Sequence, residues 1–373
     1  MQFVLHLLYT KDNRLSRKKP KKAVTLVRKD LYDMKKLKVA MIGFGGIARS
    51  HYAGYLSLAE KDAPVELVAV LDKNPEQLTR QIKINTSNEE IRLPESMHTY
   101  TDLEELIATE EFDVADICLP TYLHKEFAVR LLHAGKHVLC EKPMALSSSE
   151  CAEMLEAERE SGKRLMIGQC LRFGPAYQYL KACIEDGRFG KLKNLTMNRL
   201  SAAPIWGYEN WFMHTERSGG CILDMHIHDV DMARFLLGEP QAVSTVATDG
   251  TVRWETQNTR LFYPDLTVVI NGSWGETRGT PFVGDFRAVF ERATVMRLPT
   301  ENVIVYYENG TNEIPEMSEE ASITREIEFF AWTILEGREN LTNPSSSAAT
   351  TVRLIEALRE SAAQGGAKLT WKA

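Results

Sequence analysis

The chain has 373 residues, more than a single hydrophobic core usually organises, so two domains are expected. Hydrophobic residues make up 44% and charged residues 26%, as in ordinary globular proteins, and no apolar run reaches the ~18 residues of a membrane-spanning helix. The net charge of −6 gives no reason to expect a nucleic-acid or membrane partner.

The first 33 residues differ in charge from the rest. They hold nine Lys and Arg against three Asp and Glu, a net of +6, which leaves −12 for the remainder. Their short apolar run has no charge before it, unlike an export signal. Met34 opens "MKKLKVAMIGFGG", which is typical of a bacterial N-terminus. We therefore expect residues 1–33 to be an extension, either a non-native start or disordered. The six scattered cysteines fit reduced thiols in a cytoplasmic protein.

Short apolar runs alternate with helix-like stretches from Leu37 onward. The strand-like runs are 37–43, 65–72, 114–120, 137–141 and 164–170, and the helix-like stretches are 46–60, 102–109, 122–134 and 147–161. Strands that are apolar throughout, with helices between them, indicate a parallel sheet covered on both faces. We expect an α/β fold with a doubly wound sheet over about 34–170.

The pattern changes after residue 170. Segments such as "KNLTMNRLSA" and "TRLFYPDLTVVINGSW" are β-rich and joined by short turns, which indicates a largely antiparallel sheet in an α+β domain. We expect one helix near 221–237 within this part. The segment "SSSAATTVRLIEALRESAAQGG" predicts a capped amphipathic helix that packs back on the body.

The segment "GFGGIA" at 43–48 has the G-x-G-x-x-A form of a dinucleotide-binding turn. It follows an apolar strand and opens a helix, and the next strand ends in Asp72, 24 residues beyond Ala48, which is the context that such a turn requires. Gly43 permits the tight turn, and Gly45 lets a pyrophosphate approach the backbone. The helix N-terminus would then face the phosphates. A glycine turn without a ligand is the alternative.

Asp72 bears on the choice between NAD and NADP. Its carboxylate would accept hydrogen bonds from the adenosine ribose hydroxyls and would repel a 2′-phosphate, which favours NAD. Lys73 follows directly and could neutralise such a phosphate, so NADP stays open as the alternative.

Four segments occur in the order seen in one oxidoreductase family: "KVAMIGFGGIARSH", "ADICLPTYLH", "GKHVLCEKPMAL" and "SGGCILDMHIHDVDMARFLLGEP". From Met34 almost to its C-terminus, the chain resembles the glucose–fructose oxidoreductase, inositol dehydrogenase and MocA-type (Gfo/Idh/MocA) oxidoreductases. The resemblance implies a Rossmann domain, placed at 34–155, and a C-terminal substrate-binding and oligomerisation domain with an open, mostly antiparallel sheet, placed at 156–373. It also implies a homodimer or homotetramer, and hydride transfer between NAD(P) and a hydroxyl carbon of a sugar, inositol or related polyol.

The resemblance also assigns catalytic residues. The family's lysine in E-K-P falls on Lys142, and its aspartate and histidine fall on Asp224 and His228. Alcohol oxidation must remove a hydroxyl proton as hydride leaves, and histidine suits that proton, so we predict His228 as general base. Lys142 would hydrogen-bond the reacting oxygen, although the lysine could itself take the proton. Asp224 would orient the imidazole or hold a substrate hydroxyl.

Further residues are expected to contact the ligands. The predicted cofactor-binding residues are Gly43, Gly45, Gly46, Ile47, Ala48, Asp72, Lys73, Pro120, Thr121, His124, Glu141, Lys142, Gln169 and Arg172. For His124 the alternative is a histidine satisfied by the backbone, and for Arg172 it is a salt bridge between the domains. Trp206, Tyr208 and Trp211 could stack on a polyol face, although aromatic clusters more often belong to a core.

The segment "DMHIHDVD" at 224–231 raises the question of a metal site. On a helix, Asp224, His228 and Asp231 share one face, and His226 lies about 200° round from Asp224. In a strand, residues 224, 226 and 228 would share a face and metal binding would be an option. We predict a helix and no metal. The family usually has a glycine where His226 lies, so His226 is either a substrate-facing variation or a histidine packed against neighbouring structure.

Two other functions stay open. A relative of this fold could be an NAD-dependent glycosidase that works through transient oxidation. A non-catalytic NAD-binding sensor would keep the glycine turn and lose the lysine and the histidine. The presence of Lys142 and His228 argues against the sensor, and the sequence says little against the glycosidase.

Overall fold

The protein is described by a computed structural model, which covers residues 36–78, 93–299 and 302–373. The predictions for residues 1–33 lie outside this range. From Leu37 to Ala373 the chain forms one compact unit. Within the described ranges, none of the helices combines the length and apolar character that crossing a bilayer requires.

The first sheet has six parallel strands in the order β3-β2-β1-β4-β5-β6. These strands are β1 (Leu37–Ile42), β2 (Val65–Leu71), β3 (His98–Tyr100), β4 (Val114–Ile117), β5 (His137–Glu141) and β6 (Leu165–Gly168). The inner strands are buried almost throughout, as a parallel sheet with two covered faces requires. This confirms the predicted doubly wound sheet. By strand pairing the sheet runs past residue 155, because β6 is its last strand.

The connecting helices begin and end at the signals that the sequence carries. They are α2 (Gly46–Glu60), η2 (Pro75–Leu78), α3 (Leu103–Thr109), α4 (Thr121–His133) and α5 (Ser148–Ser161). The Asp102 and Ser147 side chains cap the N-termini of α3 and α5, and Gly162 ends α5 with a φ of 63°. The strand order reverses between β1 and β4, and the carboxyl ends of strands at such a point form a ligand crevice.

The second sheet has nine strands in the order β14-β13-β12-β11-β7-β10-β9-β8-β15. These strands are β7 (Leu192–Leu200), β8 (Ala242–Thr248), β9 (Thr256–Tyr263), β10 (Leu266–Ser273), β11 (Val283–Phe290), β12 (Ala293–Arg297), β13 (Val303–Tyr307), β14 (Asn312–Glu313) and β15 (Leu369–Thr370). Its pairs are antiparallel except for β7 with β10. Burial alternates along β7, as in a sheet with one covered face. The mostly antiparallel sheet is thus confirmed.

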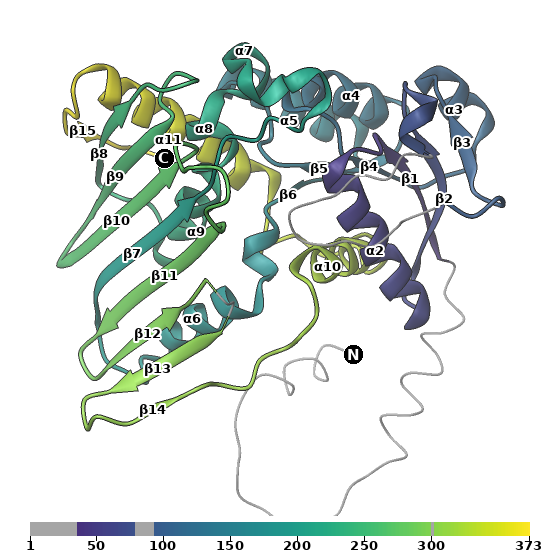
Figure 1. Cartoon of the computed structure of the whole chain (residues 1–373). Helices are drawn as coiled ribbons and strands as arrows, with labels where there is room; N and C mark the ends of the chain where they lie inside the picture. The colour runs from purple at the N-terminus through teal and green to yellow at the C-terminus, as the bar shows by residue number, and fades with distance from the viewer. Residues whose placement is uncertain (1–35, 79–92, 300–301) are drawn as a thin grey trace, which may run out of the picture. The chain divides into compact units, whose positions relative to one another are not determined.

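The remaining helices are η3 (Cys170–Phe173), α6 (Pro175–Asp186), η4 (Tyr208–Met213), α7 (Thr215–Ser218), α8 (Gly220–Asp224), α9 (Ile227–Leu237), α10 (Ser322–Leu335) and α11 (Ser345–Ala363). Of these, η3 and α6 connect β6 to β7, and the others stand between strands of the second sheet. The helices α9 and α11 pack on one face of the nine-stranded sheet, whereas α10 lies against α2 of the first domain (Figure 1). The sequence predicted α11 but neither α6 nor α10.

The prediction of a single helix near 221–237 is wrong, because the structure divides this segment into α8 and α9. The backbone amides of Met225 and His226 both donate to the carbonyl oxygen of Cys221, at 3.0 and 2.9 Å. That turn therefore contains one residue more than a regular α-helical turn, as in a π-type bulge. The bulge lies between Asp224 and His228, so the regular spacing of four residues on one helical face does not hold across it.

Candidate active site at the strand ends

The glycine turn has the geometry of a phosphate-binding loop. Gly43 has a φ of 91°, and a Cβ there would lie 2.8 Å from Leu119 Cδ2 and 2.9 Å from the carbonyl oxygen of Cys118, so a larger residue does not fit. Gly45 precedes the first turn of α2, and nothing lies within 4 Å of the place its Cβ would take. At Gly45 the backbone before α2 is therefore open to an anionic ligand.

Asp72 follows β2 and is tied to this turn. Its Oδ2 accepts a hydrogen bond from the backbone amide of Phe44 at 2.8 Å, and its Oδ1 accepts one from Asn74 at 2.9 Å. The ammonium of Lys73 lies 4.6 Å from the ring centroid of Tyr208. The carboxylate expected to contact the ribose is thus held at the edge of the turn, next to a cation bound by an aromatic ring.

Lys142 directly follows β5, and its amine meets a residue of the second domain. Nζ donates to the backbone carbonyl oxygen of Asp224 at 2.8 Å and to the Asp224 carboxylate at 3.1 Å. The two side chains are only 16% and 12% exposed, which strengthens the pair relative to a surface pair. We expected Asp224 to orient an imidazole or hold a hydroxyl; the contact that the structure shows is with Lys142.

His228 lies in the first turn of α9, and its Nδ1 is buried with no hydrogen-bond partner among the described residues. Burial, followed by the positive charges of Lys142 and Arg199, holds the pKa of His228 well below its usual range. The imidazole is therefore neutral at neutral pH. A neutral imidazole beside a lysine can accept a proton.

His226 is packed into the core, so its expected place among the substrate residues is wrong. The ring is fully buried, and Nε2 lies 2.8 Å from Thr259 Oγ1 of β9. A Cβ at Gly272 of β10 would lie 2.6 Å from Nδ1, so the sheet leaves no spare room there. Burial and the charge of Arg199 lower the pKa of His226 to about 3. Of the two alternatives, the histidine packed against neighbouring structure is the one observed.

Two other predicted residues line the same edge with unpaired polar atoms. The hydroxyl of Thr121, at the start of α4, and Nε2 of Gln169, after β6, are buried without a hydrogen-bond partner among the described residues. Buried polar atoms normally have partners. With the open turn at Gly45, these two atoms fit a polar ligand such as a dinucleotide.

His124 takes the role of a structural histidine. It is buried, and its ring nitrogens lie 2.7 Å from the carbonyl oxygen of Pro143 and 2.8 Å from that of Leu119. The ring therefore joins the turn after β4 to the segment after β5. Burial lowers the pKa of His124, so the neutral ring carries one N–H and donates to one of these two carbonyl oxygens. These contacts match the backbone-satisfied alternative, and the cofactor contact stays a prediction.

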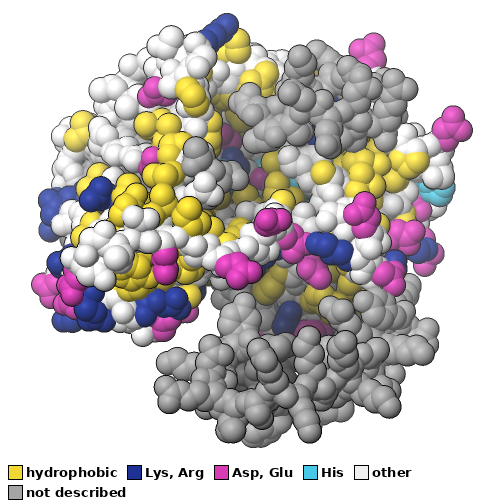
Figure 2. Space-filling view, turned by 60° about the horizontal axis from the view of Figure 1, so that its bottom comes forward, with side chains coloured by type: hydrophobic (Ala, Val, Ile, Leu, Met, Phe, Trp, Pro, Cys, Tyr) yellow, Lys and Arg dark blue, Asp and Glu magenta, His cyan; other side chains and the backbone are white. Residues whose placement is uncertain are grey.

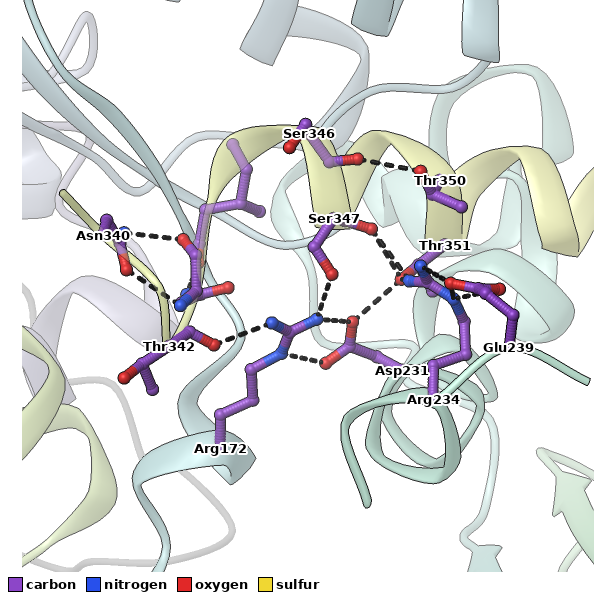
Figure 3. A network of polar contacts seen from close by, with 12 residues as sticks. Arg172, Asp231, Arg234, Glu239, Asn340, Thr342, Ser346, Ser347, Thr350 and Thr351 are labelled. Carbon is purple, nitrogen blue, oxygen red and sulfur yellow. Dashed lines mark hydrogen bonds and ion pairs between the residues drawn. The ribbon is translucent and has the colours of Figure 1, made fainter. Parts of the chain in front are cut away.

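Arg172 belongs to a salt bridge network between distant segments (Figure 3). Its guanidinium donates to both carboxylate oxygens of Asp231 at 2.8 and 2.6 Å, to the Thr342 carbonyl at 2.9 Å and to Ser347 Oγ at 2.8 Å. Arg172 is 2% exposed. The structure thus shows the salt bridge that was the alternative for Arg172, although its partner Asp231 lies in the same 156–373 range. The cofactor contact of Arg172 stays a prediction.

The aromatic residues Trp206 and Tyr208 are exposed, and their stacking on a polyol stays a prediction. A Cβ at Gly46 would lie 3.2 Å from the Trp206 ring, so Trp206 lies over the glycine turn. The ring of Trp211 stacks on Phe212 at 3.9 Å between centroids, and Phe212 in turn packs edge-on to Trp274. Trp206 therefore contacts the glycine turn, and Trp211 contacts Phe212.

The sequence interpretation missed a group of buried ionisable residues beneath the site. His51 of α2 contacts Asp116 of β4 and Glu141 of β5, and Glu326 of α10 lies near them. Two signals were available. His51 shares the buried face of its helix with Tyr52 and Tyr55, and Asp116 interrupts the apolar run "VADICLP". A charged residue in such a strand is rare without a partner.

The buried carboxyl of Glu326 should make the free energy of unfolding depend on pH. Both carboxyl oxygens are buried without a partner among the described residues, and burial, with the charge of Glu141, holds the pKa of Glu326 well above its usual range. The folded protein therefore keeps a proton that the unfolded chain loses as pH rises above about 4.5. Stability should fall in that window by up to about 1.4 kcal/mol per pH unit from this group.

In Glu326→Gln this fall should be absent, so the variant should gain stability relative to wild type between about pH 5 and about pH 8. Urea unfolding followed by circular dichroism at both pH values measures the difference. Glu328→Gln, in the same helix and only half-buried, is the matched control and should follow wild type. Parallel pH curves for Glu326→Gln and wild type would show that Glu326 is ionised in the folded protein.

Comparison with known proteins places both domains. Residues 37–169 match the family model described as "Oxidoreductase family, NAD-binding Rossmann fold", and residues 177–296 match the "GFO/IDH/MocA C-terminal domain". The chain is similar to an inositol 2-dehydrogenase of Rhizobium meliloti, with 29% identity over 64% of this chain and 66% of the relative. It is also similar to a myo-inositol 2-dehydrogenase of Thermotoga maritima, with 32% identity over 63% of this chain and 64% of the relative.

These two matches span just under two thirds of the length of the relatives. Among solved structures, an oxidoreductase from Agrobacterium radiobacter in complex with NAD+, L-tartaric acid and magnesium has the same fold. Its TM-score is 0.74 at 21% identity, with 90% of this chain and 98% of that chain covered. The paired domain matches and the shared fold establish that the chain belongs to the Gfo/Idh/MocA family of oxidoreductases, with an NAD-binding Rossmann domain at its N-terminal side.

Proposed function

We propose that the protein is an NAD-dependent oxidoreductase that transfers hydride between the nicotinamide and a hydroxyl carbon of a sugar, inositol or related polyol. The observation that carries this proposal is the meeting of Lys142 with Asp224, next to a neutral His228, where the parallel strands end. The inositol dehydrogenases among the relatives support the substrate class.

The cofactor would lie along the carboxyl ends of the parallel strands. Gly43 and Gly45 would let the pyrophosphate reach the N-terminus of α2, and Asp72 would receive the ribose hydroxyls. Thr121 and Gln169 offer buried polar atoms that lack partners among the described residues. When bound, the nicotinamide supplies the hydride acceptor or donor.

The chain's own residues would handle the reacting oxygen and its proton. The ammonium of Lys142 already points to two oxygens of Asp224, and a substrate hydroxyl could take up one of its three donors. A cation at that place stabilises the negative charge that develops on the oxygen during oxidation, and it polarises the carbonyl during reduction. His228, kept neutral by burial and by Lys142, would accept the hydroxyl proton only transiently, because the same burial and charge disfavour the imidazolium form.

A substrate panel tests this function. Purified full-length protein is incubated with NAD or NADP and a set of inositols, aldoses and polyols, and formation of the reduced cofactor is followed by absorbance. We expect turnover with at least one polyol and NAD. Tight NAD binding without turnover would favour a sensor, and aglycone release from a nitrophenyl glycoside would favour a glycosidase.

The charge of Asp72 should determine the preference for NAD over NADP. In Asp72→Asn, which removes the charge but keeps an acceptor for the Phe44 amide, the repulsion of a 2′-phosphate is lost. The ratio of kcat/KM for NAD to that for NADP should fall by about tenfold or more. Lys73→Met is the matched variant, and its NADP activity should decrease. An unchanged ratio in Asp72→Asn would show that this carboxylate does not read the ribose.

We also propose that copies of the chain associate through the open face of the nine-stranded sheet, as a dimer or tetramer. That face carries a ladder of amide hydrogen bonds, Asn258 to Asn271 at 2.8 Å, Asn271 to Asn198 at 2.8 Å and Asn198 to Asp285 at 2.7 Å. In Figure 2 hydrophobic side chains gather on the left half of the view, where Figure 1 places this sheet. Light scattering of the purified protein measures the mass in solution.

Three broader assignments belong to the same proposal. The cofactor-binding domain is placed at 34–155 and the substrate-binding domain at 156–373, with the refinement that β6 completes the first sheet. The compartment is the cytoplasm, supported by six free cysteines. The physiological partner is a small-molecule polyol or sugar.

A further inference from the structure

A buried imidazole lies behind Lys142, between α2 and the first sheet. His51 is fully buried, its Nδ1 lies 2.8 Å from Asp116 Oδ2, and its Nε2 lies 2.9 Å from Glu141 Oε1. Carboxylate oxygens accept hydrogen bonds, so both ring nitrogens must carry a hydrogen. Burial opposes this charge, but the charge of Asp116 prevails and holds the pKa of His51 well above its usual range.

Glu141 connects this imidazolium to the backbone of the lysine. Its Oε1 faces His51, and its Oε2 accepts the backbone N–H of Lys142 at 3.0 Å. A Cβ at Gly168 would lie 3.2 Å from Oε1, so β6 presses against the carboxylate from the other side. Burial alone would raise the pKa of Glu141, but the hydrogen bond and charge of His51 keep it below its usual value. The carboxylate is thus held in place from two sides.

We propose that His51 is a positioning residue for the hydride-transfer reaction: through Glu141 it fixes the backbone of Lys142 at the end of β5. The amine of Lys142 is thereby directed to Asp224 and to the reacting oxygen. This inference rests on the proposed function, because it assigns His51 a part in that reaction. The ring nitrogens of His51 are engaged by Asp116 and Glu141, so its action on Lys142 would run through Glu141.

The same cluster offers a matched control. The hydroxyl of Tyr55 donates to Asp116 Oδ2 at 2.9 Å, and Tyr55 is as deeply buried as the rest of the cluster. Its hydrogen bond reaches Asp116 alone and not the Glu141 arm. Tyr55→Phe therefore removes a buried hydrogen bond from the cluster while leaving the contact between His51 and Glu141 intact.

Two amide variants separate the two arms of the imidazole. In His51→Gln the side-chain amide can take the place of Nε2, next to Glu141, whereas in His51→Asn it can take only the place of Nδ1, next to Asp116. We expect His51→Asn to lower kcat by about 10- to 100-fold without changing KM for NAD, because a small displacement of the catalytic group suffices for such a loss. His51→Gln should retain most of the activity, and Tyr55→Phe should match wild type.

A second readout does not depend on turnover. Acetic anhydride modifies free amines, and peptide mass spectrometry gives the rate at which Lys142 is acetylated in the full-length protein. When Lys142 is no longer fixed against Asp224, its amine should be modified several-fold faster. We expect this acceleration in His51→Asn and not in Tyr55→Phe. If His51→Asn does not fold, Glu141→Gln replaces it and should show the same acceleration.

The outcomes distinguish the two proposals. If wild type turns over no polyol but Lys142 acetylation still separates His51→Asn from Tyr55→Phe, the proposed function fails and the positioning of Lys142 by His51 stands. If wild type is active and His51→Asn equals Tyr55→Phe in both kcat and acetylation rate, the positioning role is overturned. Equal loss in His51→Gln and His51→Asn, with unchanged acetylation of Lys142, would likewise overturn it.

Discussion

Lys142→Ala should reduce kcat for polyol oxidation by about 1,000-fold, while the Kd for NAD stays within about threefold of wild type. The amine of Lys142 is the cation that meets Asp224 at the domain boundary, and without it the developing charge on the substrate oxygen has no donor. The glycine turn and Asp72 are untouched by the substitution. Initial rates of NADH formation and fluorescence titration with NAD measure the two quantities.

His228→Ala should cause a comparable loss of kcat if its neutral imidazole accepts the hydroxyl proton.

Lys125→Ala is the matched control for Lys142→Ala, because Lys125 lies on α4, pairs with Glu153 at 3.1 Å and is partly exposed. It should keep wild-type kinetics. Loss of NAD binding together with turnover in Lys142→Ala would contradict the assignment, because the lysine would then act mainly in holding the cofactor.

Arg172→Ala should lower the free energy of unfolding by about 3–5 kcal/mol, the usual cost of leaving one member of a buried ion pair alone. Asp231 is 1% exposed and also accepts a hydrogen bond from Thr351 at 2.8 Å, so the unpaired carboxylate cannot simply turn to water. The Thr342 carbonyl and Ser347 would lose their donor as well. Urea unfolding followed by circular dichroism measures the change.

Arg188→Ala is the control for this prediction. Arg188 also pairs with an aspartate, Asp186, but both side chains are more than 40% exposed, so its loss should change stability little. The double variant Arg172→Met/Asp231→Leu should be more stable than Arg172→Ala, because it leaves no buried charge without a partner. A change below about 1 kcal/mol in Arg172→Ala would show that solvent reaches Asp231.

The first domain could be predicted from the sequence because its signals are local. The strands are continuous apolar runs, the caps Asp102 and Ser147 stand at the helix starts, and Gly162 stands at a helix end. The strand β3 was missed because it has only three residues and no apolar run. In the second domain the β-rich reading obscured α6 and α10, although "REIEFFAWTIL" in α10 has helical apolar spacing.

The break between α8 and α9 could not be predicted, because its cause is tertiary. The segment around His226 reads as a continuous helix, but the buried ring reaches Thr259 of β9, which is 33 residues away in sequence. For Arg172 and His124 the sequence offered a salt bridge and a backbone-satisfied ring as alternatives, but it could not name the partners, a distant carboxylate and two backbone carbonyls. Motif spacing placed Lys142 and Asp224 in the site, but only the packing of the domains shows that they touch.

The two ends of the nine-stranded sheet are both strands of two residues, β14 and β15. A short border strand offers few free backbone amides and carbonyls, so another sheet cannot extend it by strand addition. The last strand is further fastened by Trp371, whose indole N–H donates to Glu239 at 2.9 Å. Extension of the sheet from one molecule into the next is thereby disfavoured, and the proposed association of copies would use the open face instead.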